Sequence, residues 1–201
     1  MRLISMHVLK WNAENPIFLS SAYELGFISW YQRSFFKEGL IFGVRTITGR
    51  VQQGTRTAIK LDEAKAIAYV VVQNNRAVVI VCDEEYPQNV PFIIIREIFS
   101  ELDKIITNEQ VGELKEDTNI NFERLQVMVK EYQDYKKADK LAQLQSNLQE
   151  LQEITFKVMT DLVKKGEDLK VLMEKSKDLS QVSVNVYKQS KKFNSRCCVL
   201  I

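Results

Sequence analysis

A seam of apolar residues with an alternating three- and four-residue spacing runs through the C-terminal part of this 201-residue chain. Eleven of its sixteen positions carry a large apolar side chain. The seam consists of Leu141, Leu144, Leu148, Leu151, Thr155, Val158, Leu162, Lys165, Leu169, Leu172, Ser176, Leu179, Ser183, Val186, Ser190 and Phe193. Held over more than seven heptads, this spacing predicts a helix that packs against partner helices as a coiled coil. At about 1.5 Å per residue, the helix would be roughly 80 Å long.

The five polar seam positions indicate what kind of bundle this helix forms. Lys165 lies at the midpoint, where a buried ammonium has to be paired or stay near water, and such a residue typically fixes register and oligomer state at a cost in stability. Thr155, Ser176, Ser183 and Ser190 leave thin layers. Because so sparse a seam would make a weak homodimer, we expect larger side chains of different partner helices to fill these layers. The alternative is an ordinary surface helix from which Lys165 extends to water.

Length, charge and cysteine content exclude several classes of protein. The length suits one domain of about 130 residues plus an extension. A net charge of +2 and a pI of about 8.3 give no positive field for nucleic acid. No apolar run approaches the ~18 residues that span a bilayer and no secretory signal is visible, so we expect a cytosolic protein.

Three cysteines give neither a disulfide framework nor zinc spacing, so we expect no metal and no cofactor. Cys82 lies in an apolar strand and is interpreted as an inert buried thiol.

Periodicity predicts a β-β-α-β-β-β-α domain before the coiled coil. The predicted strands are 3–9, 17–19, 57–61, 66–73 and 76–82, the predicted helices are 29–48 and 89–107, the segment 108–119 is a loop, and 122–135 continues as a helix. Asn74 and Asn75 are typical of a tight hairpin turn. We therefore expect an α+β fold in which helices flank a five-stranded antiparallel sheet.

The predicted helix 29–48 has two apolar faces. One sector of about 80° holds four apolar side chains, those of Phe36, Leu40, Val44 and Ile47. Tyr31, Phe35 and Phe42 fall on nearly the opposite side. Because only one face can pack on the sheet, the aromatic face is left for another contact.

The C-terminal residues are typical of a lipidation signal. The chain ends with Cys198, two aliphatic residues and Ile201, which is the pattern that a prenyltransferase recognises, and Cys197 is a candidate site for palmitoylation. A single lipid chain binds membranes marginally, and a second lipid or a basic segment makes binding stable. The basic residues before the cysteines are Lys188, Lys191, Lys192 and Arg196. Ile201 leaves both farnesyl and geranylgeranyl open.

These features together resemble the prenylated longin-type R-SNAREs of the synaptobrevin superfamily. The most specific runs are Tyr31-Gln32-Arg33-Ser34, Gly54-Thr55-Arg56, Asp83-Glu84-Glu85-Tyr86-Pro87, Lys165-Gly166-Glu167 and Cys197-Cys198. The resemblance covers essentially the whole chain. It implies a longin (profilin-like) domain at 1–130, a SNARE coiled-coil motif at 131–194 and a lipidation tail at 195–201.

The resemblance also implies a function in membrane fusion. The helix would join three glutamine-SNARE helices and zipper from Leu141 toward Phe193. The lipidated tail would hold the protein on the cytoplasmic face of Golgi, vesicle and endosomal membranes. The central layer of the family falls on Lys165, where the family has arginine. Because lysine lacks the planar five-donor fork, this layer would be looser or would select partners differently.

Longin domains of this kind can fold back on their own SNARE helix and lipid. We expect the face of Tyr31, Phe35 and Phe42 to make this autoinhibitory contact in a cytosolic closed form. An enzyme is disfavoured, because a Cys82–His7 nucleophile pair would need an accident of strand pairing, and no phosphate loop or metal cluster is visible. The remaining alternative is a lipid-anchored coiled-coil tether or trafficking adaptor.

Overall fold

The computed structural model describes residues 1–61, 64–134, 136, 154–162 and 169–186. The chain divides into two compact units, one made of residues 1–27 and 44–162 and the other of residues 28–43 and 163–201. Helix α1 (Arg33–Arg50) contributes its first part to the second unit and its last turns to the first.

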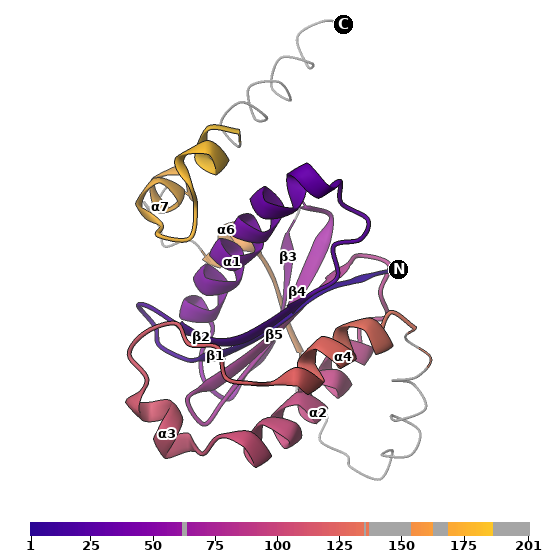
Figure 1. Ribbon diagram of the computed structural model, residues 1–201, viewed down its shortest axis with the longest axis vertical. Helices are drawn as coiled ribbons and strands as arrows, with labels where there is room; N and C mark the ends of the chain where they lie inside the picture. Colours follow the sequence, from indigo (N-terminus) through magenta and orange to yellow (C-terminus); the bar gives the residue numbers. More distant parts are fainter. Residues whose placement is uncertain (62–63, 135, 137–153, 163–168, 187–201) are drawn as a thin grey trace, which may run out of the picture. The chain divides into compact units, whose positions relative to one another are not determined.

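The first unit is built on one six-stranded sheet with the strand order β2-β1-β5-β4-β3-β6 (Figure 1). Its first five strands pair antiparallel, which confirms the predicted α+β architecture. They are β1 (Leu3–Lys10), β2 (Ile17–Tyr23), β3 (Arg56–Leu61), β4 (Ala66–Gln73) and β5 (Arg76–Asp83). A sixth strand, β6 (Ile154–Val158), pairs parallel to β3 and comes from the segment that carries the apolar seam.

The central strand β5 is buried on both faces because helices cover both sides of the sheet. Its run of β-branched and small apolar residues suits such a position, where one-sided alternation is not needed. The turn into β5 is formed by Asn74 and Asn75 with φ of 50° and 59°, as the sequence predicted. Ile80 of β5 packs in the core that faces α2 (Val90–Ile105) and α4 (Glu123–Glu131). The C-terminal turns of α1, with Val44 and Ile47 buried, lie on the other side (Figure 1).

A short helix, α3 (Asn108–Glu113), forms where the sequence analysis expected a loop at 108–119. Thr107 and Gln110 make a reciprocal capping box at its start, in which the Thr107 hydroxyl accepts from the Gln110 N–H and the Gln110 side chain accepts from the Thr107 N–H. The spacing Thr-x-x-Gln is a sequence signal for such a helix start. The rest of the predicted loop then covers the β2 edge, since Thr118 N donates to Phe18 O at 2.8 Å.

The seam segment differs from the single continuous helix that its spacing predicts. Among its described residues, β6 is followed by the short helices α6 (Met159–Leu162) and α7 (Leu169–Lys175), a non-helical stretch at 176–180, and helical residues at 181–186. A heptad seam stabilises a helix only when partner helices bury it. Ile154, Thr155, Phe156 and Val158 have high β propensity, so the same residues pair readily with a sheet edge.

We predict that the core between α2 and the sheet carries much of the stability of the first unit. Ile94 is fully buried, so Ile94→Ala should lower the free energy of unfolding by about 2–5 kcal/mol through lost transfer energy and cavity formation. The measurement is urea unfolding. Val127→Ala on α4, where Val127 is 51% exposed, is the control and should change the free energy by less than about 0.5 kcal/mol. Similar losses for both variants would contradict this assignment of the core.

Candidate functional site

The edge of β3 holds part of the predicted coiled-coil segment. In the parallel register, Ile154 faces Arg56, Phe156 faces Ala58 and Val158 faces Lys60. An uncovered edge strand presents a row of unpaired N–H and C=O groups, which act as a template for pairing with another strand. In this structure β6 occupies that template.

The alternation of a strand divides the side chains of β6 between the two faces of the sheet. Ile154, Phe156 and Val158 project on one side, and Thr155 and Lys157 on the other. Ile154 packs against the main core, whereas Phe156 stays 59% exposed. The contact between β6 and the domain is therefore deepest at Ile154.

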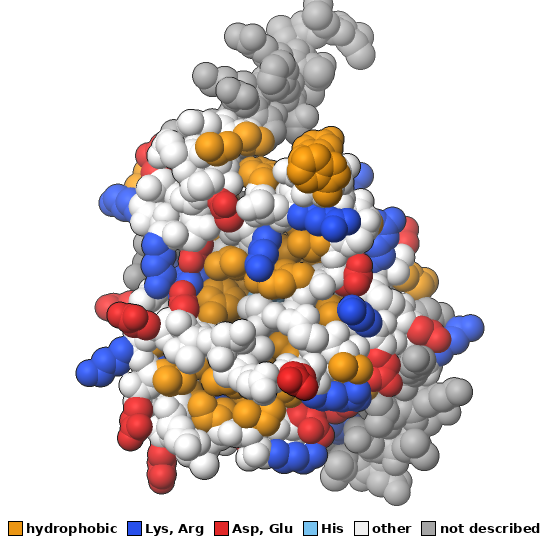
Figure 2. Space-filling view, viewed as in Figure 1, with side chains coloured by type: hydrophobic (Ala, Val, Ile, Leu, Met, Phe, Trp, Pro, Cys, Tyr) orange, Lys and Arg blue, Asp and Glu red, His pale blue; other side chains and the backbone are white. Residues whose placement is uncertain are grey.

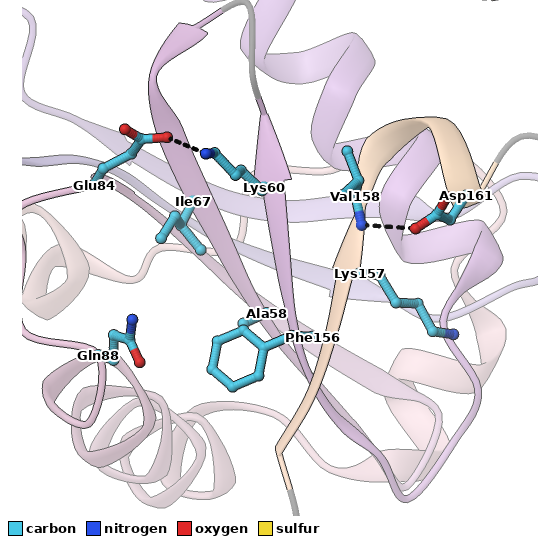
Figure 3. Close-up of a pocket in the computed structure, with 9 residues that line it drawn as sticks. All are labelled: Ala58, Lys60, Ile67, Glu84, Gln88, Phe156, Lys157, Val158 and Asp161. Carbon is cyan, nitrogen blue, oxygen red and sulfur yellow. Dashed lines mark hydrogen bonds and ion pairs between the residues drawn. The ribbon is translucent and has the colours of Figure 1, made fainter.

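A groove of about 450 Å³ lies beside the β3–β6 pair (Figure 3). At one end the Phe156 ring reaches from β6 to Ala58 of β3. Ile67 of β4, the register partner of Lys60, lies toward the other end. At its polar end Lys60 Nζ and Glu84 Oε1 form an ion pair at 3.2 Å. The other lining residues are Gln88, Lys157, Val158 and Asp161. Among the lining side chains that the structure describes, none is a nucleophile paired with a base.

The geometry of β6 excludes its use in a coiled coil at the same time. In a helix, the seam positions Thr155 and Val158 are three residues apart and lie on one face. In β6 they project from opposite faces, because the period of a strand is two residues. The segment therefore has to leave β3 and refold before its seam can pack against partner helices.

In the second unit, Glu38 of α1 binds the seam segment at Ser180 and Ser183. Glu38 Oε2 accepts hydrogen bonds from Ser180 N at 2.8 Å and from Ser183 Oγ at 2.6 Å. Ser183 N in turn donates to Ser180 Oγ at 3.2 Å, so Ser180 caps the helical residues 181–186. In a capping box, a side chain of the helix itself accepts a hydrogen bond from the backbone N–H of the capping residue. Here the carboxylate of Glu38, which lies on another helix, accepts from Ser180 N.

These hydrogen bonds also stabilise the charged form of Glu38. The pKa of Glu38 is lowered, first by the Ser183 hydroxyl and then by the Ser180 backbone N–H. A carboxyl whose pKa is lower in the folded state contributes stability above its ordinary pKa, and this contribution is lost as the pH falls. Acid is thus expected to loosen this contact.

Glu38 lies on the helix face where the sequence analysis placed the autoinhibitory contact, since it follows Phe35 by three residues and precedes Phe42 by four. Phe42 is buried at 9% exposure, whereas Tyr31 and Phe35 are 66% and 38% exposed. Glu38 is not among the site residues predicted from the sequence. An acidic residue within an aromatic helix face was the signal that could have identified it.

The other seam positions have varied environments. Leu162 and Ser183 are buried, Leu169, Leu172, Ser176 and Leu179 are half-buried, and Thr155 and Val186 are exposed. Several predicted site residues lie outside the described residues: Leu141, Leu144, Leu148, Leu151, Lys165, Ser190, Phe193, Cys197 and Cys198. Their predicted roles stay predictions.

The structure separates the two residues of the rejected nucleophile pair. His7 is buried in β1, with its ring nitrogens 3.0 Å from Ser21 Oγ and 2.9 Å from Ser5 Oγ. Cys82 is fully buried in the core that faces α2 and α4, and its partner in β1 is Leu3. Within the described ranges, no group of three or more His, Cys, Asp or Glu side chains could hold a metal ion.

Comparison with known proteins gives a family for both the domain and the whole chain. The longin family, described as a regulated-SNARE-like domain, matches residues 27–129. The VAMP-like protein YKT61 of Arabidopsis thaliana is 34% identical over 202 residues, and the match covers all of both chains. The synaptobrevin homologs YKT6 of Yarrowia lipolytica and ykt6 of Schizosaccharomyces pombe are 30% and 29% identical over the same full length.

The strand register predicts a specific cross-link. With Cys197 and Cys198 replaced by serine, the double variant Lys60→Cys, Val158→Cys should form an intramolecular disulfide on mild oxidation, because facing residues of paired strands bring their Cβ atoms within reach. Faster migration on a non-reducing gel reports the bond. The matched control is Lys60→Cys, Lys157→Cys, in which the second thiol projects from the other face of β6. Equal oxidation rates for the two pairs would contradict the parallel register.

The Glu38 contact predicts a pH dependence that can be measured locally. Protection of the Ser180 amide against hydrogen exchange should persist through the ordinary titration range of a glutamate and fall only at more acidic pH, because the Ser183 hydroxyl and the Ser180 N–H lower the pKa of Glu38. Glu38→Gln should reduce the protection several-fold at neutral pH and remove its pH dependence, since a neutral acceptor makes the weaker hydrogen bond. Glu123→Gln on the exposed side of α4 is the control. An unchanged profile in Glu38→Gln would show that Glu38 does not hold this helix.

Proposed function

This chain belongs to the longin-type R-SNAREs of the synaptobrevin family, which are trafficking proteins and not enzymes, and we propose that it supplies one helix to a four-helix fusion complex with three glutamine-SNARE helices. The observation that carries the proposal is the full-length match to synaptobrevin homologs, which extends over the seam segment as well as over the longin domain. The partly polar seam supports it, because thin layers are filled best by partners with larger side chains.

In this complex the seam would zipper from Leu141 toward Phe193 and draw two membranes together. Lys165 would form the central layer and face three glutamines. Its ammonium keeps the positive charge and three donors but lacks the planar geometry of arginine, so this layer would be more tolerant of its partners. Assembly itself depends on the apolar layers on both sides of Lys165.

The membrane attachment in this proposal is covalent lipid. Cys198 would carry a prenyl group and Cys197 a reversible palmitoyl group, and two lipid chains together give stable membrane residence. In the part of the chain that the structure describes, no helix is long and apolar enough to cross a bilayer. The lipidated protein would act at the cytoplasmic face of Golgi, vesicle and endosomal membranes, and the unpalmitoylated protein would return to the cytoplasm.

We further propose that the longin domain holds the SNARE segment in a closed form. Two sets of contacts support this, the pairing of β6 with β3 and the hydrogen bonds of Glu38 with Ser180 and Ser183. Phe42 on the same face of α1 would cover apolar seam or lipid, which would otherwise be exposed in the cytosol. Because β6 and the seam helix exclude one another, leaving the closed form would be a required step before assembly.

A coiled-coil tether or adaptor is the second candidate. A tether is expected to form a stable pair with a single partner helix. Ser176, Ser183 and Ser190 argue against this, since two-helix packing around three serine layers would leave little apolar contact.

The proposal is tested by assembly with purified glutamine-SNARE helices from the same cell. The unlipidated chain, mixed with cognate sets, should give a one-to-one-to-one-to-one complex on a sizing column, with a gain of helix by circular dichroism. Leu169→Asp should weaken assembly at least tenfold because a carboxylate would be buried in an apolar layer. Lys170→Asp, one position outside the seam, is the control and should assemble normally.

Assembly with one helix alone, or with no set at all despite a protease-accessible seam segment, would support the tether instead. The locked double variant Lys60→Cys, Val158→Cys adds a separate test of the closed form. When oxidised it should assemble slowly, and reduction should restore the rate.

A further inference from the structure

Among the described residues, the seam segment has two points at which a helix begins directly after a residue that is not helical. Helix α6 begins at Met159, after the strand β6, and the helical residues 181–186 begin after the non-helical stretch 176–180. In a continuous seam helix neither start exists, because each backbone N–H donates to the carbonyl four residues earlier. The two helix starts therefore distinguish this form of the chain from the assembled form.

At each of these helix starts a carboxylate accepts the backbone N–H of the preceding residue. Val158 N donates to Asp161 Oδ2 at 3.1 Å, which is the dashed line beside β6 in Figure 3. In the second unit, Ser180 N donates to Glu38 Oε2 at 2.8 Å. In a continuous helix both N–H groups would donate to backbone carbonyls instead. Both carboxylates would then lose these hydrogen bonds.

Asp161 occupies a position in α6 at which an acidic residue stabilises a helix start. It is the third residue of the helix and reaches back to the N–H of Val158, the residue before the helix, as the acidic residue of a capping box does. Its negative charge also lies beside first-turn N–H groups that have no acceptor within the helix. Asp161 therefore stabilises the junction at which β6 ends and α6 begins.

The same residue has the opposite effect in a continuous seam helix. There Asp161 would lie in the helix interior, one position before the seam residue Leu162, where aspartate forms helix less well than most residues. Because Asp161 is exposed, each of the two effects is modest, and each changes the equilibrium by about threefold. Together they favour the strand-to-helix junction over the continuous helix by about tenfold.

We propose that Asp161 biases the chain toward its closed form, by stabilising a junction that exists only while β6 pairs with β3. The inference rests on the proposed function, which supplies the two forms that compete for this segment. Glu38 acts on the segment from α1, whereas Asp161 lies within the segment itself. The seam segment thus carries part of its own inhibition, and this part is released when the helix becomes continuous.

Other roles for this carboxylate have less support in the described part of the chain. Acidic and basic side chains are interspersed on the face that Figure 2 shows. Lys60 and Glu84, which line the same groove as Asp161, form an ion pair with one another. No group of described His, Cys, Asp and Glu side chains that includes Asp161 could hold a metal ion. The hydrogen bond from Val158 N therefore gives the best account of this residue.

The experiment measures hydrogen exchange in the full-length, unlipidated chain without partners. Asp161→Ala should speed exchange of the β6 peptide by about two- to fivefold, because the junction loses its carboxylate. Asp161→Glu should exchange at the wild-type rate, since glutamate is the usual residue at this position of a capping box. Glu123→Ala is the matched control, because it removes a first-turn carboxylate from α4, outside the seam segment, and should leave β6 unchanged. The central strand β5 is the internal reference for an intact domain.

Two results would overturn the role of Asp161 alone. One is an unchanged exchange rate of β6 in Asp161→Ala, and the other is equally fast exchange in Asp161→Ala and Asp161→Glu. If β6 of the wild-type chain exchanges as fast as an unfolded peptide, the proposed closed form fails, and the role of Asp161 fails with it. Glutamine-SNARE helices are absent from these measurements, so the assembly test is decided separately.

Discussion

The open edge of β3 pairs with part of the segment that carries the apolar seam. The two edges of the sheet are treated differently. The β2 edge receives a loop of the same domain, through the hydrogen bond of Thr118 to Phe18. The β3 edge receives Ile154–Val158, a segment whose spacing is that of a coiled coil. If β6 leaves this edge, N–H and C=O groups of β3 lose their hydrogen-bond partners. An unpaired strand edge of this kind can pair with another chain.

In the proposed closed form, this arrangement would link the longin domain to the timing of assembly. A strand with a period of two and a helix with a period of 3.6 cannot present the same residues to two partners at once. In the second unit, Glu38 adds a charged hydrogen-bond acceptor that helps to hold the start of the helical residues 181–186. The closed and the assembled state would therefore compete for the same segment. In the proposed complex, the glutamine-SNARE helices would have to bury enough apolar surface to make the assembled state the more stable one. Lys165, which lies outside the described residues, would change the stability of the assembled state without determining which state forms.

The sequence by itself determined the five antiparallel strands, the helices α1, α2 and α4, the Asn74–Asn75 turn and the family, because these depend on local periodicity and turn chemistry. Helix α3 was also encoded, in Thr107 and Gln110, although its capping signal was missed. Tertiary structure alone decided the state of Ile154–Val158. These residues satisfy both a heptad seam and β propensity, so the outcome depends on which partner is present, an edge strand distant in sequence or three other helices. Glu38 became a site residue for the same reason, since its hydrogen-bond partners are brought to it only by the folded chain.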